Sequence, residues 1–382
     1  MNMEDGAFMQ KKILMITPLP PPMTGQALAC QILYEHLLNT HNYVENINLS
    51  KQSFVSGVDS FSRIKEIFGV LCQVFKKASS ADQIYFTPAE SVAGNLKDLL
   101  IYILIYRRIG NTVIHLHGGA GMRKILCNRR NPLRYLNAFF ISKMQGVIVL
   151  GDRLTDIYSG LIAADKIHIA PNFSQADYFI STKELKQKYS NSDSVKILFL
   201  SNLLPGKGYD DLLNGYKKLP PECRDRVYLD FAGGFENDGA KNDFIAAISN
   251  LPNVSYHGVV SGEKKKKLLR DATIFCLPTY YPYEGQPISI LEAYASGCVV
   301  ITTDHSGIFD IFKPGFNGID VEIKNEDAIA NAIVSILNDR DMIRRIAVSN
   351  LYMARHKYQI KHHIKIMSDI MDDVNNFSTP VR

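Results

Sequence analysis

The stretch YPYEGQPISILEAYASGCVVITT, residues 281–303, decides how this chain is expected to fold. It places Glu284 in a loop that contains glycine and proline, and Glu292 eight positions later in a segment with helical spacing. Pro287 suits the first turn of that helix, because proline lacks the amide hydrogen that would go unpaired there. The apolar run at 298–301 follows and indicates a buried strand. Together these features predict a loop, a helix N-terminus and a strand at the edge of an α/β sheet.

The start of this predicted helix indicates an anion site. Unpaired backbone amides and the helix dipole attract negative charge there, most simply a phosphate. The residues of the segment are Gly285, Gln286, Pro287, Ile288 and Ser289. A carboxylate so close to an anion, Glu284, is better suited to holding sugar hydroxyl groups than to binding phosphate. Two unrelated surface carboxylates are the alternative, although a solvated helix would not need the glycine, the proline and the buried strand.

Composition sets limits on the class of protein. The 382 residues predict two or three domains, and 46% hydrophobic with 21% charged residues is typical of a globular protein. A net charge of +5 does not by itself indicate nucleic acid as a partner. The six cysteines include no CxxC pair, so they are expected to be reduced in a cytosolic protein. No signal peptide is expected, and the longest apolar run, 99–106, is far shorter than the roughly 20 residues that span a bilayer.

The first half of the chain alternates predicted strands with helical patterns. An apolar run at 12–17 is followed by a proline-rich turn and by apolar residues at helical spacing over 28–37, the opening unit of a doubly wound sheet. Gly25 lies in the connecting loop, where its backbone can approach a ligand closely, but the loop lacks the GxGxxG pattern of dinucleotide-binding proteins. Further strands are expected at 83–86, 112–117, 146–150 and 167–170.

A second unit of the same type is expected after a polar linker at 174–194. The run KILFL at 196–200 repeats the Lys-Ile-Leu of 12–14, and the next loop, 201–208, carries Lys207 between two glycines. Lys207 is predicted to place a positive charge on a diphosphate, with an ordinary loop lysine as the alternative. Further strands are expected at 226–232, 254–257, 273–277 and 298–303, and an amphipathic helix at 359–374.

Other polar residues leave two interpretations open. His117 ends a predicted strand just before two glycines, at the edge where open α/β sheets bind ligands, so a substrate contact and a structural role carry equal weight. His115 is expected to be structural, and the four lysines at 264–267 are expected to form a solvated helix face. No metal site is expected, because HExxH and Cys/His clusters are missing from the sequence.

The segment 121–145 combines apolar residues with six basic residues and no acidic residue. Its basic residues are Arg123, Lys124, Arg129, Arg130, Arg134 and Lys143. A basic amphipathic helix of this kind can lie on an anionic membrane. A helix packed in the core, with its basic face toward solvent, is the equally weighted alternative.

Two α/β units with an acidic pair in the second resemble the GT-B glycosyltransferases. The sequence EGQPISILEAYASGCVVITTD is similar to the signature of the retaining glycosyltransferase family 4, the glycosyl transferases group 1. Supporting matches are HLHG at 115–118, PNF at 171–173, FAGG at 231–234 and YHG at 256–258. The resemblance implies two Rossmann-like, doubly wound parallel-sheet domains that face a cleft. The expected ranges are 1–175 for the acceptor domain, 176–358 for the donor domain, and 359–382 for a C-terminal helix that packs back on the first domain.

The resemblance also assigns roles to particular residues. Glu284 and the amides of 285–289 hold the hydroxyl groups of the donor sugar, and Glu292 holds the ribose. Lys207 neutralises the diphosphate, and Gly25 approaches it from the other domain. His117 lies beside the donor sugar at the reacting carbon, so His117 and Glu284 are the residues expected in catalysis.

Two positions depart from the family pattern, Asn202 and Cys298, and the cysteine stands where the family often has a proline. Asn202 stands in the donor loop where the family usually has an arginine, so one diphosphate cation is missing or comes from elsewhere. The donor is expected to be a UDP- or GDP-sugar, bound as substrate without a cofactor or a metal ion. Retention in this family is described as front-face attack in which the leaving phosphate helps to deprotonate the acceptor, so no protein nucleophile is expected.

The function implied is transfer of a sugar from a nucleotide-diphospho-sugar to a lipid-linked or other glycan acceptor in bacterial surface polysaccharide assembly, such as O-antigen or capsule. The protein is expected in the cytoplasm, peripheral at the inner face of the membrane through 121–145, and without a nucleic-acid partner. Two alternatives remain. A GT-B nucleotide-sugar epimerase would consume donor without an acceptor, and a catalytically degenerate sugar-nucleotide-binding protein would bind donor without turnover.

Overall fold

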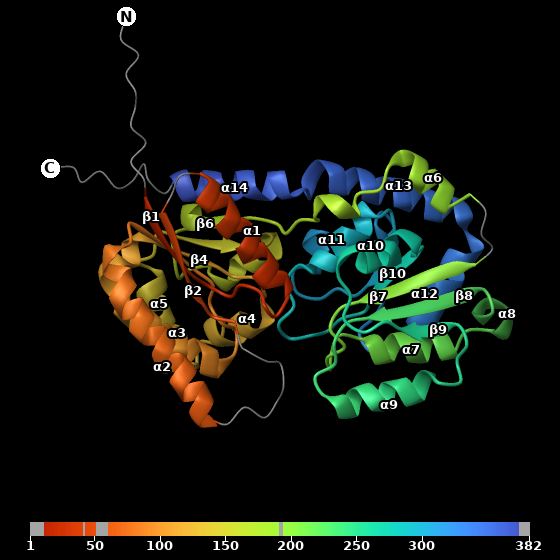
Figure 1. The fold of residues 1–382 in the computed structure, drawn as a ribbon, viewed down its shortest axis with the longest axis horizontal. Coiled ribbons are helices and arrows are strands. Elements are labelled where there is room, and N and C mark those ends of the chain that lie inside the picture. Colours follow the sequence, from red (N-terminus) through yellow and green to blue (C-terminus); the bar gives the residue numbers. More distant parts are fainter. Residues whose placement is uncertain (1–10, 41–42, 51–59, 191–193, 374–382) are drawn as a thin grey trace, which may run out of the picture.

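The structure, a computed structural model, describes residues 11–40, 43–50, 60–190 and 194–373. It has two halves, each built around a parallel six-stranded sheet (Figure 1). The strands of the N-terminal half are β1 (Lys12–Thr17), β2 (Tyr43–Asn48), β3 (Gln83–Phe86), β4 (Thr112–His115), β5 (Gly146–Val149) and β6 (Ile167–Ile169). Those of the C-terminal half are β7 (Val195–Leu200), β8 (Val227–Ala232), β9 (Val254–Tyr256), β10 (Ile274–Leu277), β11 (Val299–Thr302) and β12 (Gly318–Asp320).

Helices flank both sheets. In the N-terminal half they are α1 (Gly25–Asn39), α2 (Ser60–Lys77), α3 (Val92–Leu104), α4 (Ala120–Leu126) and α5 (Pro132–Ile141). The later helices are α6 (Thr182–Lys188), α7 (Tyr209–Lys217), α8 (Pro221–Arg224), α9 (Asp238–Ile248), α10 (Gly262–Asp271), α11 (Ile288–Ala295), α12 (Glu326–Asn338), α13 (Arg340–Lys357) and α14 (Ile360–Asp373). Short 3-10 helices are η1 (Ala78–Ser80), η2 (Tyr106–Asn111), η3 (Asp152–Ile157), η4 (Ala164–Lys166), η5 (Ala176–Tyr178) and η6 (Ile308–Asp310).

The strand order decides where ligands can bind. The first sheet runs β2-β1-β3-β4-β5-β6 and the second β12-β11-β10-β7-β8-β9. The order reverses between β1 and β3 in the first sheet, and between β7 and β10 in the second. Open α/β sheets bind ligands outside the carboxyl ends of the strands at such a reversal. The loops after β1, β3, β7 and β10 are therefore the positions where functional residues are expected.

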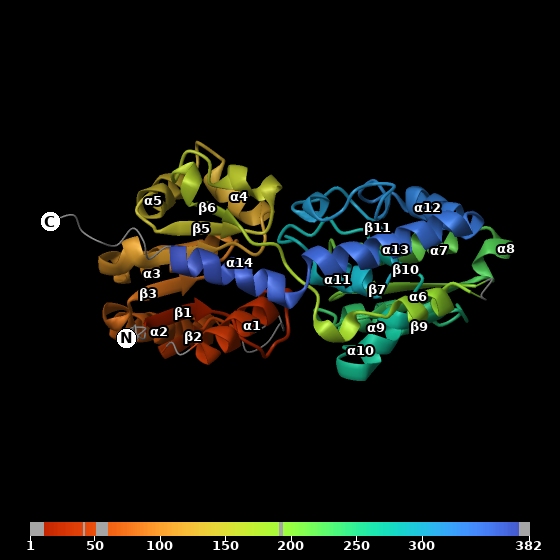
Figure 2. The same ribbon diagram turned by 90° about the horizontal axis from the view of Figure 1, so that it is seen from above.

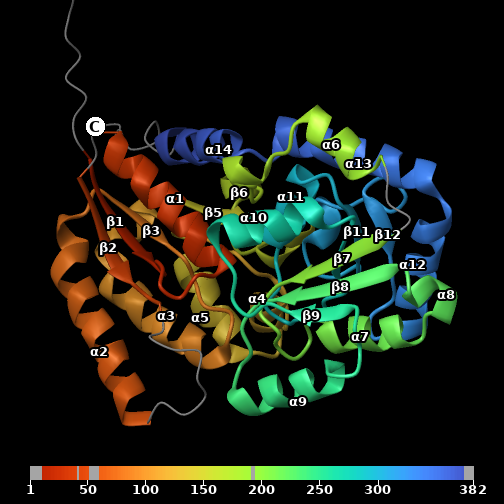
Figure 3. The same cartoon turned by 45° about the vertical axis from the view of Figure 1, so that its right-hand side comes forward.

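Each sheet is covered on both faces, as parallel sheets require. In the N-terminal half, Leu14 and Ile16 face a core shared with α2 to α5, whereas Ile13 and Met15 on the opposite face pack with α1 and α14. In the C-terminal half, α10 and α11 lie on one side of the sheet, and α7 and α9 lie on the other (Figures 1 and 3). The doubly wound α/β class predicted from the sequence is thus confirmed.

The end of the described chain crosses from one half to the other. Helix α13 packs on the C-terminal half, and α14 lies along the N-terminal half (Figure 2). Met367, Ile370 and Met371 of α14 are buried in the core beside the first sheet. His363 Nδ1 lies 2.7 Å from the carbonyl oxygen of Pro171. The helix expected at 359–374 is thus found at Ile360–Asp373, and residues 374–382 lie outside the described ranges.

Two strands were not predicted from the sequence. β2 (YVENIN) is an edge strand with a polar, partly exposed pattern, and β12 has only three residues. Both pair with strands that were predicted, β1 and β11. The strand expected at 112–117 ends at His115, so His117 lies in the loop beyond it.

Candidate functional site

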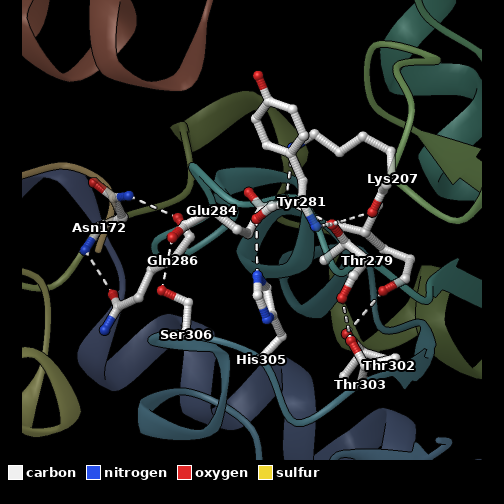
Figure 4. Close-up of polar contacts among 12 residues, drawn as sticks. Asn172, Lys207, Thr279, Tyr281, Glu284, Gln286, Thr302, Thr303, His305 and Ser306 are labelled. Atoms are coloured by element: carbon white, nitrogen blue, oxygen red, sulfur yellow. Dashed lines mark hydrogen bonds and ion pairs between the residues drawn. The ribbon is translucent and has the colours of Figure 1, made fainter. Parts of the chain in front are cut away.

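Glu284 and Lys207 form the centre of the candidate site (Figure 4). The Nζ atom of Lys207 lies 2.7 Å from Oε2 of Glu284, and the hydroxyl group of Thr279 donates to the same oxygen over 3.0 Å. Lys207 Nζ also lies 4.6 Å from the centre of the Tyr281 ring. Both members of the pair are largely buried. The loops after β7 and β10, which flank the reversal of the second sheet, thus bring one cation and one carboxylate together.

Glycine allows the lysine loop to lie this close. Gly208, beside Lys207, has a φ of +80°, and a Cβ atom there would overlap the carbonyl oxygen of Pro278. The amide of Tyr280 donates to the carbonyl oxygen of Gly206 over 2.7 Å, which ties the two loops. The predicted position of Lys207 between two glycines therefore has a steric cause.

Two helix N-termini meet beside this pair. Helix α11 begins at Ile288, with Pro287 at its N-cap and without a side chain that caps its amides. Helix α1 begins at Gly25, and a Cβ atom there would lie 3.7 Å from the side chain of Ile288. Since each N-terminus carries a partial positive charge, the two halves direct two positive dipole ends toward one place.

The loop at 285–286 joins the halves. Gly285 packs directly on the carbonyl oxygen of His117, which a Cβ atom would overlap. The side-chain amide of Gln286 donates to the carbonyl oxygen of Leu150 over 2.5 Å, and its Oε1 accepts from the amide of Asn172 over 3.2 Å. The side chain of Gln286 thus holds the two halves together. The role in donor binding predicted for this residue would therefore fall to its backbone amide.

Glu292 has a partner that the sequence analysis missed. Its Oε1 lies 2.7 Å from Nζ of Lys265, which also lies 4.8 Å from the centre of the Tyr178 ring. Glu292 is 1% exposed; burial raises its pKa, and Lys265 opposes that rise. The expectation that lysines 264–267 all form a solvated face is therefore wrong for Lys265. Four consecutive lysines cannot share one face of a helix, and this one points inward.

The backbone carbonyl oxygen of His117 lies against Gly285, and its ring is tilted against that of His115 with 4.0 Å between centroids. Its Nε2 is 4.0 Å from Sγ of Cys30, and its buried Nδ1 has no hydrogen-bond partner among the described residues. Burial lowers the pKa of His117 to about 3, with a further contribution from His363. The ring is therefore neutral at physiological pH and can act only as a hydrogen-bond donor or acceptor. His115 accepts from or donates to Tyr85 over 2.6 Å, consistent with the structural role expected for it.

Asn202 lies at the rim of the same region. Its Oδ1 accepts a long hydrogen bond, 3.4 Å, from the amide of Gly234 in the FAGG segment. The position thus links the loops after β7 and β8 and supplies no charge.

Several polar residues of the site carried no recognisable signal. Thr279, His305 and Ser306 hold the acidic loop: His305 Nε2 lies 2.8 Å from the carbonyl oxygen of Tyr281, and Ser306 donates to the carbonyl oxygen of Glu284 over 2.7 Å (Figure 4). Asn172 was quoted only as part of PNF. Each of these residues lies in a loop whose contacts depend on the tertiary fold, and no local pattern marks them.

The segment 121–145 is not the single amphipathic helix that was expected. It is divided between α4 and α5, with Asn131 as the N-cap of α5. Arg123 binds Asp156, and Arg134 donates to the carbonyl oxygen of Leu126. Within the described ranges, we find no helix with the length and apolar character required to cross a bilayer.

An exposed apolar face nevertheless exists on α3, η2 and α5. It consists of Leu96, Leu100, Ile103, Tyr106, Leu136 and Phe139, each between 45% and 58% exposed. Buried Asn95 and Asn137 exchange two side-chain hydrogen bonds between α3 and α5, and Tyr106 stacks on Phe139. We call this set the apolar face; it lies on the part of the N-terminal half remote from the C-terminal half (Figures 1 and 2).

Comparison with solved structures defines the class. The chain resembles Anabaena HepE, solved in complex with UDP and glucose, with a TM-score of 0.70 over 95% of this chain and 100% of that chain at 17% identity. Two parallel six-stranded sheets in this arrangement are the GT-B fold of glycosyltransferases.

Sequence comparison indicates the same class. Residues 181–350 match the family model described as Glycosyl transferases group 1. Together with relatives that are named glycosyltransferases, this match supports a transferase enzyme. An uncharacterized glycosyltransferase of Methanocaldococcus jannaschii is 18% identical over 69% of both chains. The N,N'-diacetylbacillosaminyl-diphospho-undecaprenol alpha-1,3-N-acetylgalactosaminyltransferase of Campylobacter jejuni is 26% identical over 43% of this chain and 42% of its own length. The matched part thus spans less than half of the Campylobacter enzyme.

Proposed function

We propose that the protein is a retaining glycosyltransferase that moves a sugar from a nucleotide-diphospho-sugar to a lipid-linked glycan acceptor in bacterial surface polysaccharide or glycolipid assembly. The observation that carries the proposal is the convergence of Lys207, Glu284 and the N-termini of α1 and α11. A UDP- or GDP-sugar has the matching chemistry, an anionic diphosphate joined to a hydroxyl-rich ring. The UDP and glucose bound by the related fold of Anabaena HepE support this donor class.

The charges account for the chemistry. Cleavage of the bond between the sugar and the diphosphate leaves negative charge on the departing nucleoside diphosphate. Lys207 and the two helix N-termini lie where they can stabilise that charge, the electrostatic contribution that dominates in many enzymes. Glu284 then accepts hydrogen bonds from the sugar, and Glu292 from the ribose. These groups supply the positive charge without a metal ion, although Asn202 contributes none.

The lipid acceptor is supported by the apolar face and by its basic surroundings. Exposed Arg129 and Arg130 precede α5, and Nζ of Lys143 lies 5.0 Å from the centre of the Phe139 ring. Apolar side chains flanked by cations suit the interface of an anionic membrane. The diphospho-undecaprenol in the name of the Campylobacter relative is an acceptor of this class. We therefore place the protein in the cytoplasm, peripheral at the inner face of the membrane.

The donor part is tested by a thermal-shift screen of UDP, GDP and their sugars. A ligand that binds the folded state alone raises the melting temperature, and the rise grows with the ratio of free ligand concentration to Kd. We expect one nucleotide series to stabilise the protein, with turnover only when a prenyl-diphosphate-linked N-acetylhexosamine is added. Donor consumption without that acceptor would indicate an epimerase, and binding without any turnover a degenerate protein.

The membrane part is tested by sedimentation with anionic phospholipid vesicles at low salt. The double variant Leu96→Ser/Phe139→Ser is expected to lose vesicle binding. A matched double variant on α13, Val348→Ser/Tyr352→Ser, removes equally exposed apolar side chains from the C-terminal half and is expected to bind normally. Equal binding by both variants would refute this part of the proposal.

A further inference from the structure

A third carboxylate, Glu90, lies on the acceptor side of the candidate site. It belongs to the loop between β3 and α3, at the carboxyl end of a strand that flanks the reversal of the first sheet. Its Oε2 accepts from the amide of Gly121 over 3.2 Å and lies 3.5 Å from that of Met122, both in the first turn of α4. The position in the first sheet corresponds to that of Glu284 in the second.

Glu90 also lies against Gly118 and Gly121, and Gly121 in turn lies beside the acidic loop. A Cβ atom on Gly118, the residue after His117, would overlap the carboxylate of Glu90. A Cβ atom on Gly121 would lie 2.7 Å from Cβ of Glu90 and 3.1 Å from the ring of Tyr283, which precedes Glu284. The carboxylate therefore lies between the His117 loop of one half and the acidic loop of the other.

The charged surroundings of Glu90 differ from those of Glu284 and Glu292, each of which is paired with a lysine. Among the described residues, no lysine or arginine forms an ion pair with it, although its side chain is only partly exposed. Burial raises its pKa to about 7; the amides of Met122, Gly121 and Gly119 oppose the rise, and Glu284 adds to it. Tyr158, the residue after η3, and Tyr281 also interact electrostatically with Glu90, and Asp98 of α3 interacts with Tyr158; none of the three brings a positive charge.

We propose that the carboxylate of Glu90 receives the proton of the acceptor hydroxyl group that attacks the donor sugar. The inference rests on the proposed function and adds a residue to it. The O–H bond of the acceptor breaks, and its proton passes to Glu90, which becomes a carboxylic acid. The acceptor oxygen bonds to the anomeric carbon, while the bond from that carbon to the diphosphate oxygen breaks and the electron pair leaves with the nucleoside diphosphate.

In the mechanism that the family resemblance implies, the leaving phosphate takes up the acceptor proton. The present assignment gives that proton to a protein side chain. A general base works best when its pKa lies close to the operating pH and when no cation holds it ionised. Glu284 and Glu292 fail the second condition, since each is paired with a lysine at 2.7 Å. Glu90 meets both conditions and faces the region between the two halves.

A purely structural role is the competing explanation, because Glu90 caps the start of α4. The variant Glu90→Gln separates the two, since glutamine keeps an oxygen that accepts from the amides of Gly121 and Met122 but cannot take up the proton. The variant Glu90→Asp keeps the carboxylate and is expected to recover part of the activity. Glu184→Gln is the matched control, because Glu184 also accepts from a backbone amide, that of Ser181, far from the site.

The experiment measures binding of UDP and of GDP by calorimetry, and transfer from a UDP- or GDP-sugar to a prenyl-diphosphate-linked N-acetylhexosamine between pH 5.5 and 9. For Glu90→Gln we expect kcat lowered by about 10²–10⁴-fold, unchanged nucleotide affinity, and loss of the rise in rate through pH 7. Transfer by Glu90→Gln at the rate and with the pH profile of the unaltered protein would overturn the inference and leave the proposed function standing. Failure of the unaltered protein to bind either nucleotide or to transfer sugar would overturn both.

Discussion

The two halves carry carboxylates at corresponding places, beside the reversal of each sheet, but the carboxylates differ in whether a cation is paired with them. In the C-terminal half, Glu284 and Glu292 each bind a lysine at 2.7 Å. In the N-terminal half, Glu90 is held by backbone amides of α4 and, among the described residues, by no cation. A site for an anionic donor needs positive charge, whereas a carboxylate that takes up a proton must not be held ionised. On the proposed function, this difference separates a donor side from an acceptor side.

The largest effect is expected from removal of the donor-side cation. Lys207→Met leaves Glu284 without its partner and the departing diphosphate without its nearest positive charge. We expect a loss of about 10³-fold in kcat/KM, the scale reported for one preorganised electrostatic group. Lys218→Met is the control, since Lys218 pairs with Glu326 and Asp327 at the surface of α12. Equal rates for the two variants would show that Lys207 does not contribute to sugar transfer.

The contact between the two sides provides the next test. A Cβ atom on Gly285 would overlap the backbone carbonyl oxygen of His117, which cannot rotate away as a side chain would. Gly285→Ala is therefore expected to push the halves apart by a fraction of an ångström to about 1 Å and to lower transfer about 10²-fold, because small misplacements of reacting groups are costly. Gly69→Ala in α2 is expected to leave activity intact, because an added Cβ atom would meet no described residue within 4 Å beyond the neighbouring turns of its own helix. Both are measured as kcat with saturating donor.

The comparison also explains which parts of the site could be predicted from sequence. Glu284, Lys207 and the start of α11 were predictable because glycine, proline and helix spacing act over a few residues. The edge strand β2 was missed because its polar pattern does not resemble a buried strand. Lys265 and Glu90 were missed for another reason: their importance depends on partners, Glu292 and the start of α4, that are 27 and 31 or more positions away. Contacts of that separation are produced by the topology and leave no local pattern.

The buried pair of the donor side is tested by stability as a function of pH. In Lys265→Met, Glu292 keeps its burial but loses the only cation that opposes the rise of its pKa among the described residues. An acid whose folded-state pKa is raised destabilises the protein as pH rises through the unfolded value, so the deficit is largest at alkaline pH. We expect a loss of about 3 kcal/mol at pH 8, typical for one partner of a buried pair, and a smaller loss near pH 5.

The neighbouring lysine gives the matched control for that measurement. Lys266 follows Lys265 directly in the same helix and pairs with Glu263, which is exposed. Lys266→Met is expected to change the free energy of unfolding by less than about 0.5 kcal/mol at either pH. A similar loss in both variants would show that Glu292 does not depend on Lys265, and weaker nucleotide binding in Lys265→Met alone would add a role in donor affinity.

The smallest effect concerns the acceptor side and has the opposite sign. The pKa of Glu90 is raised from 4.5 to about 7, so the folded state holds this proton when the unfolded state has released it. Glu90 therefore stabilises the fold least above pH 7. Glu90→Gln has no charge to bury. Relative to the unaltered protein, its free energy of unfolding is expected to rise by about 1–2 kcal/mol from pH 5 to pH 8, after allowance for partial exposure. Hydrogen bonds with Ser181 lower the pKa of Glu184, so its stabilising contribution is already complete above pH 5, and Glu184→Gln is expected to show no such gain between pH 5 and pH 8. Urea unfolding at the two pH values measures both changes, and a Glu90→Gln variant that is less stable at pH 8 than at pH 5, relative to the unaltered protein, would show that this carboxylate serves the fold rather than the reaction.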